Sequence, residues 1–325
     1  MTTWTLLCLT LAGFQPASAE LVDVKRVWDD APHNAFTDLI RFQDRWYLAF
    51  REGQGHVSPD GALRVLTSED GETWTSAARM TSETGDLRDP KLSVTPDGRL
   101  MLAGASALHD PEPVKHRSMV WFSRDGREWS GPREIGDPDM WLWRPAWHDG
   151  KAYTVGYATR LPRLTRLYAS PDGERFEPIV PTLFTEGFAN EAALAWLPDQ
   201  TALCLLRRDE NPNTNQLGRS SPPYTEWTWK DLGVHLGGPA LLRLPEPDGR
   251  LVAGGRLHAP KAHMALCWLA PDAGSLTPFL DLPSGGDCSY PGLVLHDGLL
   301  WVSYYASHEG KTAIYLARVK LPEKP

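Results

Sequence analysis

The chain has 325 residues, a formal net charge of −8 and 42% hydrophobic residues, which is typical of a globular protein. The acidic balance excludes the basic surface that nucleic-acid binding requires. A single large all-β domain is compatible with this length, because such domains often exceed the usual domain size.

An apolar run occupies residues 3–16, and the small residues Ala17-Ser18-Ala19 follow it. This pattern is typical of a secretory signal peptide, although no Lys or Arg precedes the apolar run. We predict a leader over residues 1–19, cleaved near Ala19, and a mature domain over residues 20–325 that is secreted or periplasmic. No later stretch is long and apolar enough to span a bilayer.

Cleavage at this point removes Cys8 and leaves Cys204, Cys267 and Cys288. An odd number of cysteines argues against a disulfide framework, and Cys204 and Cys267 lie in apolar runs typical of a core. No spacing of ligand residues indicates a metal site. We therefore predict neither a metal nor any other cofactor.

A phrase of the form Ser-x-Asp-Gly-x-x-aromatic occurs at Ser68–Trp74, Ser123–Trp129 and Ser170–Phe176, with a degraded copy at Ser221–Trp227. Successive copies lie about fifty residues apart, which is the length of a propeller blade. Asp-Gly forms the turn between two strands, the Asp side chain bonds the turn amides, and the aromatic ring fills the gap between hairpins.

Between these phrases lie six short apolar segments, most of them followed by a turn that contains Asp. The segments begin at Asp38, Lys91, Pro145, Ala192, Ala240 and Gly292. The pattern gives six units, each able to form a four-stranded antiparallel sheet. We predict an all-β, six-bladed β-propeller, in which a strand near Leu21–Val27 completes the last blade.

The innermost strands of a propeller line its axis, so residues at one end of all six strands converge on one mouth. The residues expected there are Asp38, Arg88, Asp89, Trp143, Arg144, Asn190, Glu191, Gly238, Pro239 and Tyr290. Several are charged or aromatic, which suggests a site as well as a solvated rim.

These features resemble the sialidase (neuraminidase) superfamily, including its Asp-box (BNR) repeats and its exo-α-sialidases. The segment Leu48–Gly53, followed by Asp60, is similar to an early signature of that family. The order Glu191, Arg207, Tyr290 is the more specific part of the resemblance, because Asp boxes also occur in proteins that are not enzymes. The resemblance covers nearly all of the predicted mature chain.

The resemblance implies that Tyr290 is a nucleophile and that Glu191 is the base that activates it. A phenol needs such a partner because its pKa is high. Tyrosine is a known exception to the carboxylate nucleophile of retaining glycosidases, and a neutral nucleophile avoids repelling an anionic sugar. Asp60 is the implied general acid/base, and Asp89 is the second candidate for that role.

The resemblance also implies arginines that bind the carboxylate of the substrate, since a planar guanidinium matches a carboxylate with two hydrogen bonds. Arg207 and Arg256 match two of these arginines, and Arg208 is an alternative to Arg207. The place of the first arginine instead reads Phe36-Thr37-Asp38. The glutamate that normally pairs with that arginine is replaced near Tyr305.

Further arginines near the inner strand ends could compensate for the missing one. The remaining predicted binding residues are Arg51, Arg88, Arg144, Trp143 and His308. Alternatively, Arg88 and Arg144 form structural ion pairs with Asp89 or Glu191.

We therefore predict an exo-glycosidase that removes a terminal acidic sugar, sialic acid or a related sugar, with retention of configuration. The predicted partner is an acidic glycan. Two alternatives remain open: a lyase that acts on uronic-acid polysaccharides, and a propeller that binds glycans without catalysis.

Overall fold

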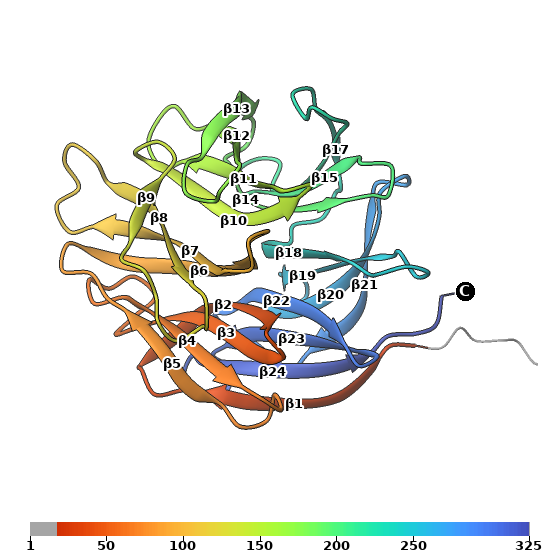
Figure 1. Ribbon diagram of the computed structural model, residues 1–325. Coiled ribbons are helices and arrows are strands. Elements are labelled where there is room, and N and C mark those ends of the chain that lie inside the picture. The colour runs from red at the N-terminus through yellow and green to blue at the C-terminus, as the bar shows by residue number, and fades with distance from the viewer. Residues whose placement is uncertain (1–17, 325) are drawn as a thin grey trace, which may run out of the picture.

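The computed structural model describes residues 18–324, which fold as six four-stranded antiparallel sheets around one axis (Figure 1). This arrangement confirms the predicted six-bladed β-propeller. No helix within residues 18–324 is long and apolar enough to cross a membrane. The predicted leader lies almost entirely outside the described residues and stays a prediction.

Each blade runs from an innermost strand at the axis to an outer strand at the periphery. Blade 1 contains β2 (His33–Phe42), β3 (Arg45–Gly53), β4 (Ala62–Ser68) and β5 (Thr75–Met80). Blade 2 contains β6 (Gly85–Val94), β7 (Leu100–Leu108), β8 (His116–Ser123) and β9 (Arg133–Ile135). Blade 3 contains β10 (Met140–His148), β11 (Lys151–Ala158), β12 (Thr165–Ser170) and β13 (Glu177–Phe184). Blade 4 contains β14 (Ala189–Trp196), β15 (Ala202–Arg208), β16 (Gln216–Ser220) and β17 (Thr228–Asp231). Blade 5 contains β18 (Gly237–Arg243), β19 (Leu251–Leu257), β20 (His263–Ala270) and β21 (Ser275–Leu282).

Blade 6 combines both ends of the described chain. It contains β22 (Cys288–His296), β23 (Leu299–Ala306), β24 (Ala313–Lys320) and, outermost, β1 (Glu20–Trp28). Strand β1 pairs antiparallel with β24, with Glu20 opposite Lys320 and Val24 opposite Ala317. The prediction that an N-terminal strand completes the last blade is therefore confirmed.

The Ser-x-Asp-Gly phrases form the turn between the third and fourth strands of blades 1, 2 and 3. In blade 1, Asp70 Oδ1 accepts hydrogen bonds from the amides of Glu72 at 2.8 Å and Thr73 at 2.9 Å. The Gly71 turn lies so close to Trp46 and Trp301 that a Cβ at Gly71 would collide with the Trp301 ring. These turns therefore fasten neighbouring blades to each other, which explains why the phrase repeats.

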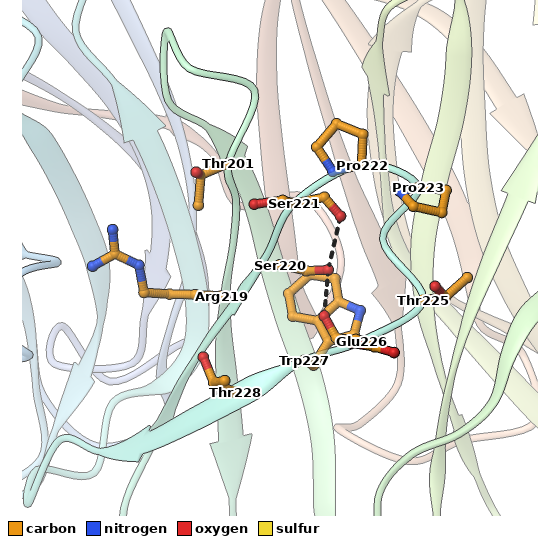
Figure 2. Close-up of a pocket in the computed structure, with 10 residues that line it drawn as sticks. All are labelled: Thr201, Arg219, Ser220, Ser221, Pro222, Pro223, Thr225, Glu226, Trp227 and Thr228. Carbon is orange, nitrogen blue, oxygen red and sulfur yellow. Dashed lines mark hydrogen bonds between the residues drawn. The ribbon is translucent and has the colours of Figure 1, made fainter.

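The fourth copy of the phrase folds in a related way without its Asp-Gly pair. Tyr224 stands at the glycine position with a φ of 66°, and the Trp227 indole donates to its carbonyl at 2.9 Å. The Ser220 hydroxyl donates to the carbonyl of Glu226 at 2.6 Å (Figure 2). This turn borders a surface hollow of about 740 Å³, at the end of blade 4 opposite Arg207.

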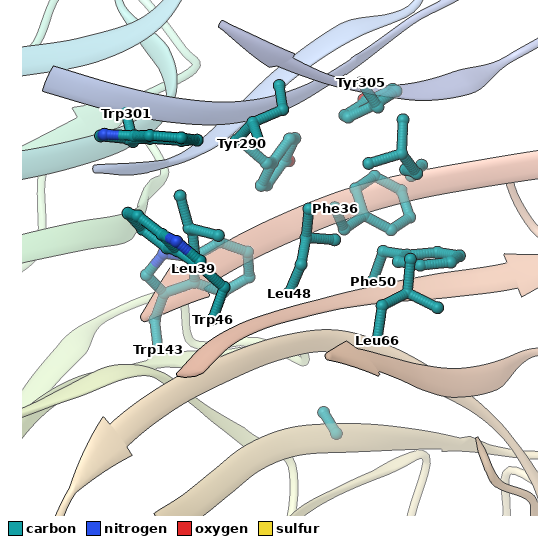
Figure 3. Close-up of a cluster of buried hydrophobic side chains, with 14 of the residues drawn as sticks. Phe36, Leu39, Trp46, Leu48, Phe50, Leu66, Trp143, Tyr290, Trp301 and Tyr305 are labelled. Atoms are coloured by element: carbon teal, nitrogen blue, oxygen red, sulfur yellow. The ribbon is translucent and has the colours of Figure 1, made fainter. Parts of the chain in front are cut away.

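The hydrophobic core lies between adjacent blades. Where blades 1 and 6 meet, the rings of Trp46 and Trp301 lie 4.5 Å apart (Figure 3). The same cluster extends inward to Phe36, Tyr290 and Tyr305. The site described below is thus continuous with the core, and its aromatic residues are held by packing on several sides.

All six innermost strands contain a β-bulge at the same level. The bulges lie at residues 36–37, 89–90, 144–145, 190–191, 238–239 and 290–291. The first bulge residue has a positive φ in five blades: Phe36, Asp89, Arg144, Gly238 and Tyr290. A bulge re-aims a side chain and ends regular pairing. In blades 1, 2, 3 and 6 the bulge residues Phe36, Asp89, Arg144 and Tyr290 carry side chains that lie at the site near the axis.

Candidate active site

Tyr290 and Glu191 form a buried hydrogen-bonded pair where blades 4 and 6 approach each other across the axis. The Tyr290 hydroxyl donates to Glu191 Oε1 at 2.5 Å, and the exposed fractions of the two residues are 8% and 7%. The backbone amide of Gly238 donates to the other carboxylate oxygen of Glu191 at 3.1 Å. Burial, followed by the charge of Glu191, raises the pKa of Tyr290 well above its ordinary value. Tyr290 therefore rests as a neutral phenol beside a base.

Arg207 completes this cluster from the neighbouring strand β15. Its Nη1 donates to Glu191 Oε2 at 2.6 Å and to the Tyr290 hydroxyl at 3.3 Å. Burial alone would lower the pKa of Arg207, but Glu191 and Tyr290 raise it well above its usual value. Arg208 points to the other side of the strand, where it pairs with Asp231. Of the two alternatives, only Arg207 lies at the site.

Asp209 fixes the position of Arg207 through the guanidinium Nε, which does not contact Glu191 or Tyr290. Its Oδ1 accepts from Arg207 Nε at 2.8 Å and lies 2.9 Å from His235 Nε2, while its Oδ2 accepts from the Asn190 amide at 2.8 Å. Burial opposes ionisation, but the His235 and Arg207 bonds outweigh it and depress the pKa of Asp209. This carboxylate fixes the Arg207 guanidinium.

Asp89 and Lys91 bring two further ionisable groups to the axis from blade 2. Burial raises the pKa of Asp89 to about 6, against the lowering effect of Lys91 and Arg88. Burial, with Arg144 second, lowers the pKa of Lys91 to about 8. A carboxyl group with a pKa near 6 can hold a proton and release it near neutral pH, as a general acid must.

Aromatic rings surround Tyr290 and fix its orientation. The Phe36 ring packs edge-on against Tyr290 with centroids 5.0 Å apart, and Trp143 lies 5.7 Å from it (Figure 3). The Lys91 ammonium lies 5.2 Å from the Trp143 ring and 5.6 Å from the Tyr290 ring. Trp143 is buried, so it forms the floor of the site.

Arg144 ties the inner strands together across the axis. Its Nη1 donates to Asp38 Oδ1 at 2.8 Å and its Nη2 to the Pro291 carbonyl at 3.0 Å. The second oxygen of Asp38 accepts from the Leu92 amide at 2.8 Å. Arg144 is thus an ion-paired residue, and its partner is Asp38 instead of Asp89 or Glu191.

Arg51 and Arg88 share one partner, Asp86, at the edge of the mouth. Arg51 is fully buried, donates to Asp86 Oδ1 at 2.8 Å, and also bonds the carbonyls of Gly55 and Ser58. Arg88 Nε lies 2.9 Å from Asp86 Oδ2. The guanidinium of Arg51 therefore holds the β3–β4 loop, whereas the Arg88 side chain is partly exposed.

Asp60 lies in that β3–β4 loop and is exposed. Its two carboxylate oxygens accept from the Gln54 amide at 3.2 and 3.1 Å. A hydrogen bond from Ser58 and the bond from Gln54 outweigh burial and lower the pKa of Asp60. In this conformation Asp60 caps the loop as a carboxylate, and its low pKa does not favour a general acid.

The last two predicted binding residues lie in blades 5 and 6. Arg256 donates to the Cys288 carbonyl at 3.0 Å, and its Nη1 lies 3.7 Å from Asp287 Oδ1. His308 lies in the exposed β23–β24 loop, where its ring faces Tyr315 at 5.1 Å. The structure therefore brings Arg256 to the mouth, but places His308 against the outer strands of its blade.

Sequence reasoning missed Lys91, Asp209, His235 and Phe36 as parts of this site. Asp209 follows Arg207 by two residues, so strand alternation could have placed it on the same side as Arg207. Lys91 follows Asp89 by two residues, but the bulge at residues 89–90 interrupts the alternation there. His235 comes from a loop and has no such signal. Phe36 was noted only as the place of a missing arginine.

The fold and the site together define a six-bladed β-propeller with a buried Tyr–Glu–Arg cluster at one mouth. No model of a known protein family matches the chain, and no curated protein matches it. Solved structures do match it. A protein of unknown function from Dyadobacter fermentans is 22% identical, with a TM-score of 0.82 over 94% of this chain and 99% of that one.

Two other similar structures are glycoside hydrolases. A Trypanosoma rangeli sialidase mutant with trans-sialidase activity is 13% identical, with a TM-score of 0.72 over 92% of this chain and 58% of its own. A Penicillium chrysogenum α-L-arabinanase complexed with arabinobiose is 13% identical, with a TM-score of 0.65 over 93% of this chain and 98% of its own. At identities this low, the structural matches establish a shared fold and nothing more specific.

Proposed function

We propose that this protein is a retaining exo-glycosidase that hydrolyses a terminal acidic sugar, with Tyr290 as the nucleophile. The observation that carries the proposal is the 2.5 Å hydrogen bond from the buried Tyr290 hydroxyl to Glu191, with Arg207 bonded to both residues. A nucleophile, its base and a fixed cation thus lie within hydrogen-bond reach of one another. Similar propellers named as a sialidase and an arabinanase support a glycosidase in general.

In the proposed first step, Glu191 takes the phenolic proton as the Tyr290 oxygen bonds the anomeric carbon. The raised pKa of Tyr290 makes this coupling necessary, because a phenolate would not form beforehand. Asp89 gives its proton to the departing glycosidic oxygen. In the second step water attacks the same carbon, Asp89 takes a proton from that water, and Glu191 returns its proton to Tyr290. The configuration is retained because the sugar is displaced twice.

Asp89 is the preferred acid over Asp60 in this proposal. Its pKa of about 6 leaves part of the population protonated near neutral pH, whereas Asp60 has a lowered pKa and caps a loop. Asp89 is also the first residue of the β6 bulge, with a φ of 53°, and a bulge re-aims the side chain at that position.

An acidic substrate is favoured by the cations that face the mouth. Arg207 bonds Asp209 through Nε and Glu191 through Nη1, so its Nη2 takes no part in these two bonds. The side chains of Arg256 and Arg88 are each partly exposed and can therefore reach a substrate. Sialic acid or a related keto-acid sugar fits these cations, and so does a uronic acid. Export of the protein, which we propose from the leader pattern, would place the site among extracellular or periplasmic glycans.

The test is hydrolysis of a panel of 4-methylumbelliferyl glycosides that carry sialic acid, glucuronic acid or arabinofuranose, with NMR of the first-formed anomer. Cleavage of an acidic member with retention, abolished by Tyr290→Phe, is the expected result. Cleavage of the arabinoside alone would contradict the acidic substrate. An unsaturated product, detected by absorbance, would indicate a lyase, and glycan binding without turnover would indicate a binding propeller.

A further inference from the structure

Three metal-ligating side chains from distant parts of the chain meet beside the Tyr290 site. His33 lies at the start of β2, His56 in the β3–β4 loop, and Asp287 directly before β22. Asp287 Oδ2 lies 3.1 Å from His33 Nε2 and 2.8 Å from His56 Nδ1. The three ligand atoms all lie within 4.8 Å of one another.

The two distances from Asp287 are close to those found between ligand atoms of a small ion. Bonds of about 2.0–2.2 Å in a tetrahedron place two ligand atoms about 3.3 Å apart, and two bound imidazole rings about 5 Å apart. The observed contacts of 3.1 and 2.8 Å require an expansion of a few tenths of an ångström. The ring centres of His33 and His56 are already 5.4 Å apart.

The surroundings hold the carboxylate so that one oxygen is directed at the two histidines. The Tyr305 hydroxyl donates to Asp287 Oδ1 at 2.8 Å, and Arg256 lies 3.7 Å from the same oxygen. The Asp287 amide donates to Ser307 Oγ at 2.9 Å. Metal-bound carboxylates are oriented in this way by a second layer of hydrogen bonds.

We propose that His33, His56 and Asp287 bind a divalent transition-metal ion, with Zn²⁺ as the first candidate, and leave a fourth position open. Imidazole nitrogens and one carboxylate suit this class of ion, and three protein ligands are typical of a site that also binds water or substrate. His33 is buried, but the His56 side chain is 52% exposed, so the open position faces the mouth. No metal was predicted from the sequence.

The position of the site suggests its role, and this part rests on the proposed function. Both histidine rings pack near the Phe36 ring: the ring centroids lie 6.2 Å apart for His33 and 5.0 Å apart for His56. The Phe36 ring in turn packs against Tyr290. Phe36 occupies the place where the family resemblance expects a carboxylate-binding arginine. An ion held beside Phe36 supplies the missing positive charge to an acidic sugar.

The experiment measures Zn²⁺ binding by calorimetry on chelator-treated full chain, and the visible spectrum after addition of Co²⁺. We expect one ion per chain, a four-coordinate Co²⁺ spectrum, and affinity at least about 100-fold weaker in His56→Asn and in His33→Asn. Tyr305→Phe should weaken binding about 10-fold to 100-fold. His148→Asn, at the opposite end of blade 3, is the matched control and should bind like the parent chain.

Absence of stoichiometric binding, or binding that both His variants retain, would overturn the proposal. His56 lies in an exposed loop, so His56→Asn keeps the test valid if His33→Asn does not fold. Binding is measured without substrate, so a chain that binds the ion but cleaves no glycoside contradicts only the proposed function. The role is tested by chelation, which should raise KM for an acidic glycoside at least about 10-fold and leave a neutral one unchanged.

Discussion

The rings of Phe36 and Tyr305 pack edge to face, with centroids 5.4 Å apart, where blades 1 and 6 meet at the mouth (Figure 3). In the family that the sequence resembles, an arginine and a glutamate are expected near these two places and pair with each other. An aromatic contact thus stands where an ion pair is expected. If the substrate is acidic, as proposed, its carboxylate must be bound by other groups, and Arg207 and Arg256 are two arginines at this site.

The first prediction concerns the Tyr290–Glu191 pair. We expect Tyr290→Phe and Glu191→Gln each to lower kcat about 10²-fold to 10⁴-fold, because either change removes the activated nucleophile. The measurement is the steady-state rate on the best glycoside of the panel. Tyr304→Phe is the control, since Tyr304 is also buried in the same blade but its hydroxyl bonds the Pro283 carbonyl, away from Glu191 and Arg207. Equal losses in Tyr290→Phe and Tyr304→Phe would refute the assignment.

The second prediction uses two adjacent arginines on opposite sides of β15. Arg207→Lys should lower kcat/KM about 10-fold to 100-fold, because lysine cannot bond Glu191, Tyr290 and Asp209 together. Arg208→Lys removes the pairing with Asp231 and Thr214, away from the site. It should lower the melting temperature while kcat/KM changes less than about 3-fold. The idea fails if the two variants lose activity equally.

The third prediction is a pH profile. If Asp89 is the acid, kcat/KM falls as pH rises through about 6, because the carboxyl loses its proton there. Asp89→Asn should abolish this limb on a substrate with a good leaving group, and lower the rate most on poor leaving groups. Asp60→Asn should keep the limb. A limb that persists in Asp89→Asn and disappears in Asp60→Asn would reverse the assignment.

The raised pKa of Asp89 also makes the stability of the fold depend on pH, and the direction of this dependence can be derived. The folded chain binds the Asp89 proton more tightly than the unfolded chain, whose carboxyl titrates near 3.8. The stabilising contribution is therefore complete below about pH 4 and is lost as pH rises to about 6. Asp89→Asn should make urea unfolding less dependent on pH across this interval, and an unchanged dependence would contradict the raised pKa of Asp89.

The fourth prediction treats Arg51 as structural. Arg51→Met leaves Asp86 without its fully buried partner and should destabilise the fold by about 3–5 kcal/mol, measured by urea unfolding. Arg117→Met is the matched control, because Arg117 and Glu134 form a solvent-exposed pair worth about 0–1 kcal/mol. If Arg51→Met is as stable as the control variant, the structural role is wrong and Arg51 is again a candidate for binding substrate.

The fold was predictable from the sequence because each blade repeats its own turn chemistry. Asp-Gly turns every fifty residues or so mark the hairpins, and six apolar segments mark the innermost strands. The grouping of Glu191, Arg207 and Tyr290 was implied by the family resemblance. Glu191 and Tyr290 lie on innermost strands, and Arg207 lies on the second strand of blade 4. Each lies near the mouth end of its strand, where the axis brings the strands together.

The sequence could not show which partners the charged residues at the mouth would bond. Arg51 lies near the end of β3 at the mouth, as a ligand-binding residue would, but the following loop accepts its hydrogen bonds. His33, His56 and Asp287 lie on three separate segments, so no spacing indicates a metal. The Arg144–Asp38 pair crosses the axis between blades 3 and 1, which sequence periodicity cannot reveal.

The pairing of β1 with β24 has a consequence for synthesis of the protein. Glu20 is translated well before its partner Lys320, so β1 has no neighbouring strand while blades 1 to 5 are translated. Closing such a long loop is slow compared with forming a local hairpin. The ring therefore becomes complete only after translation of the last blade, and until then both unpaired edges are open to other chains.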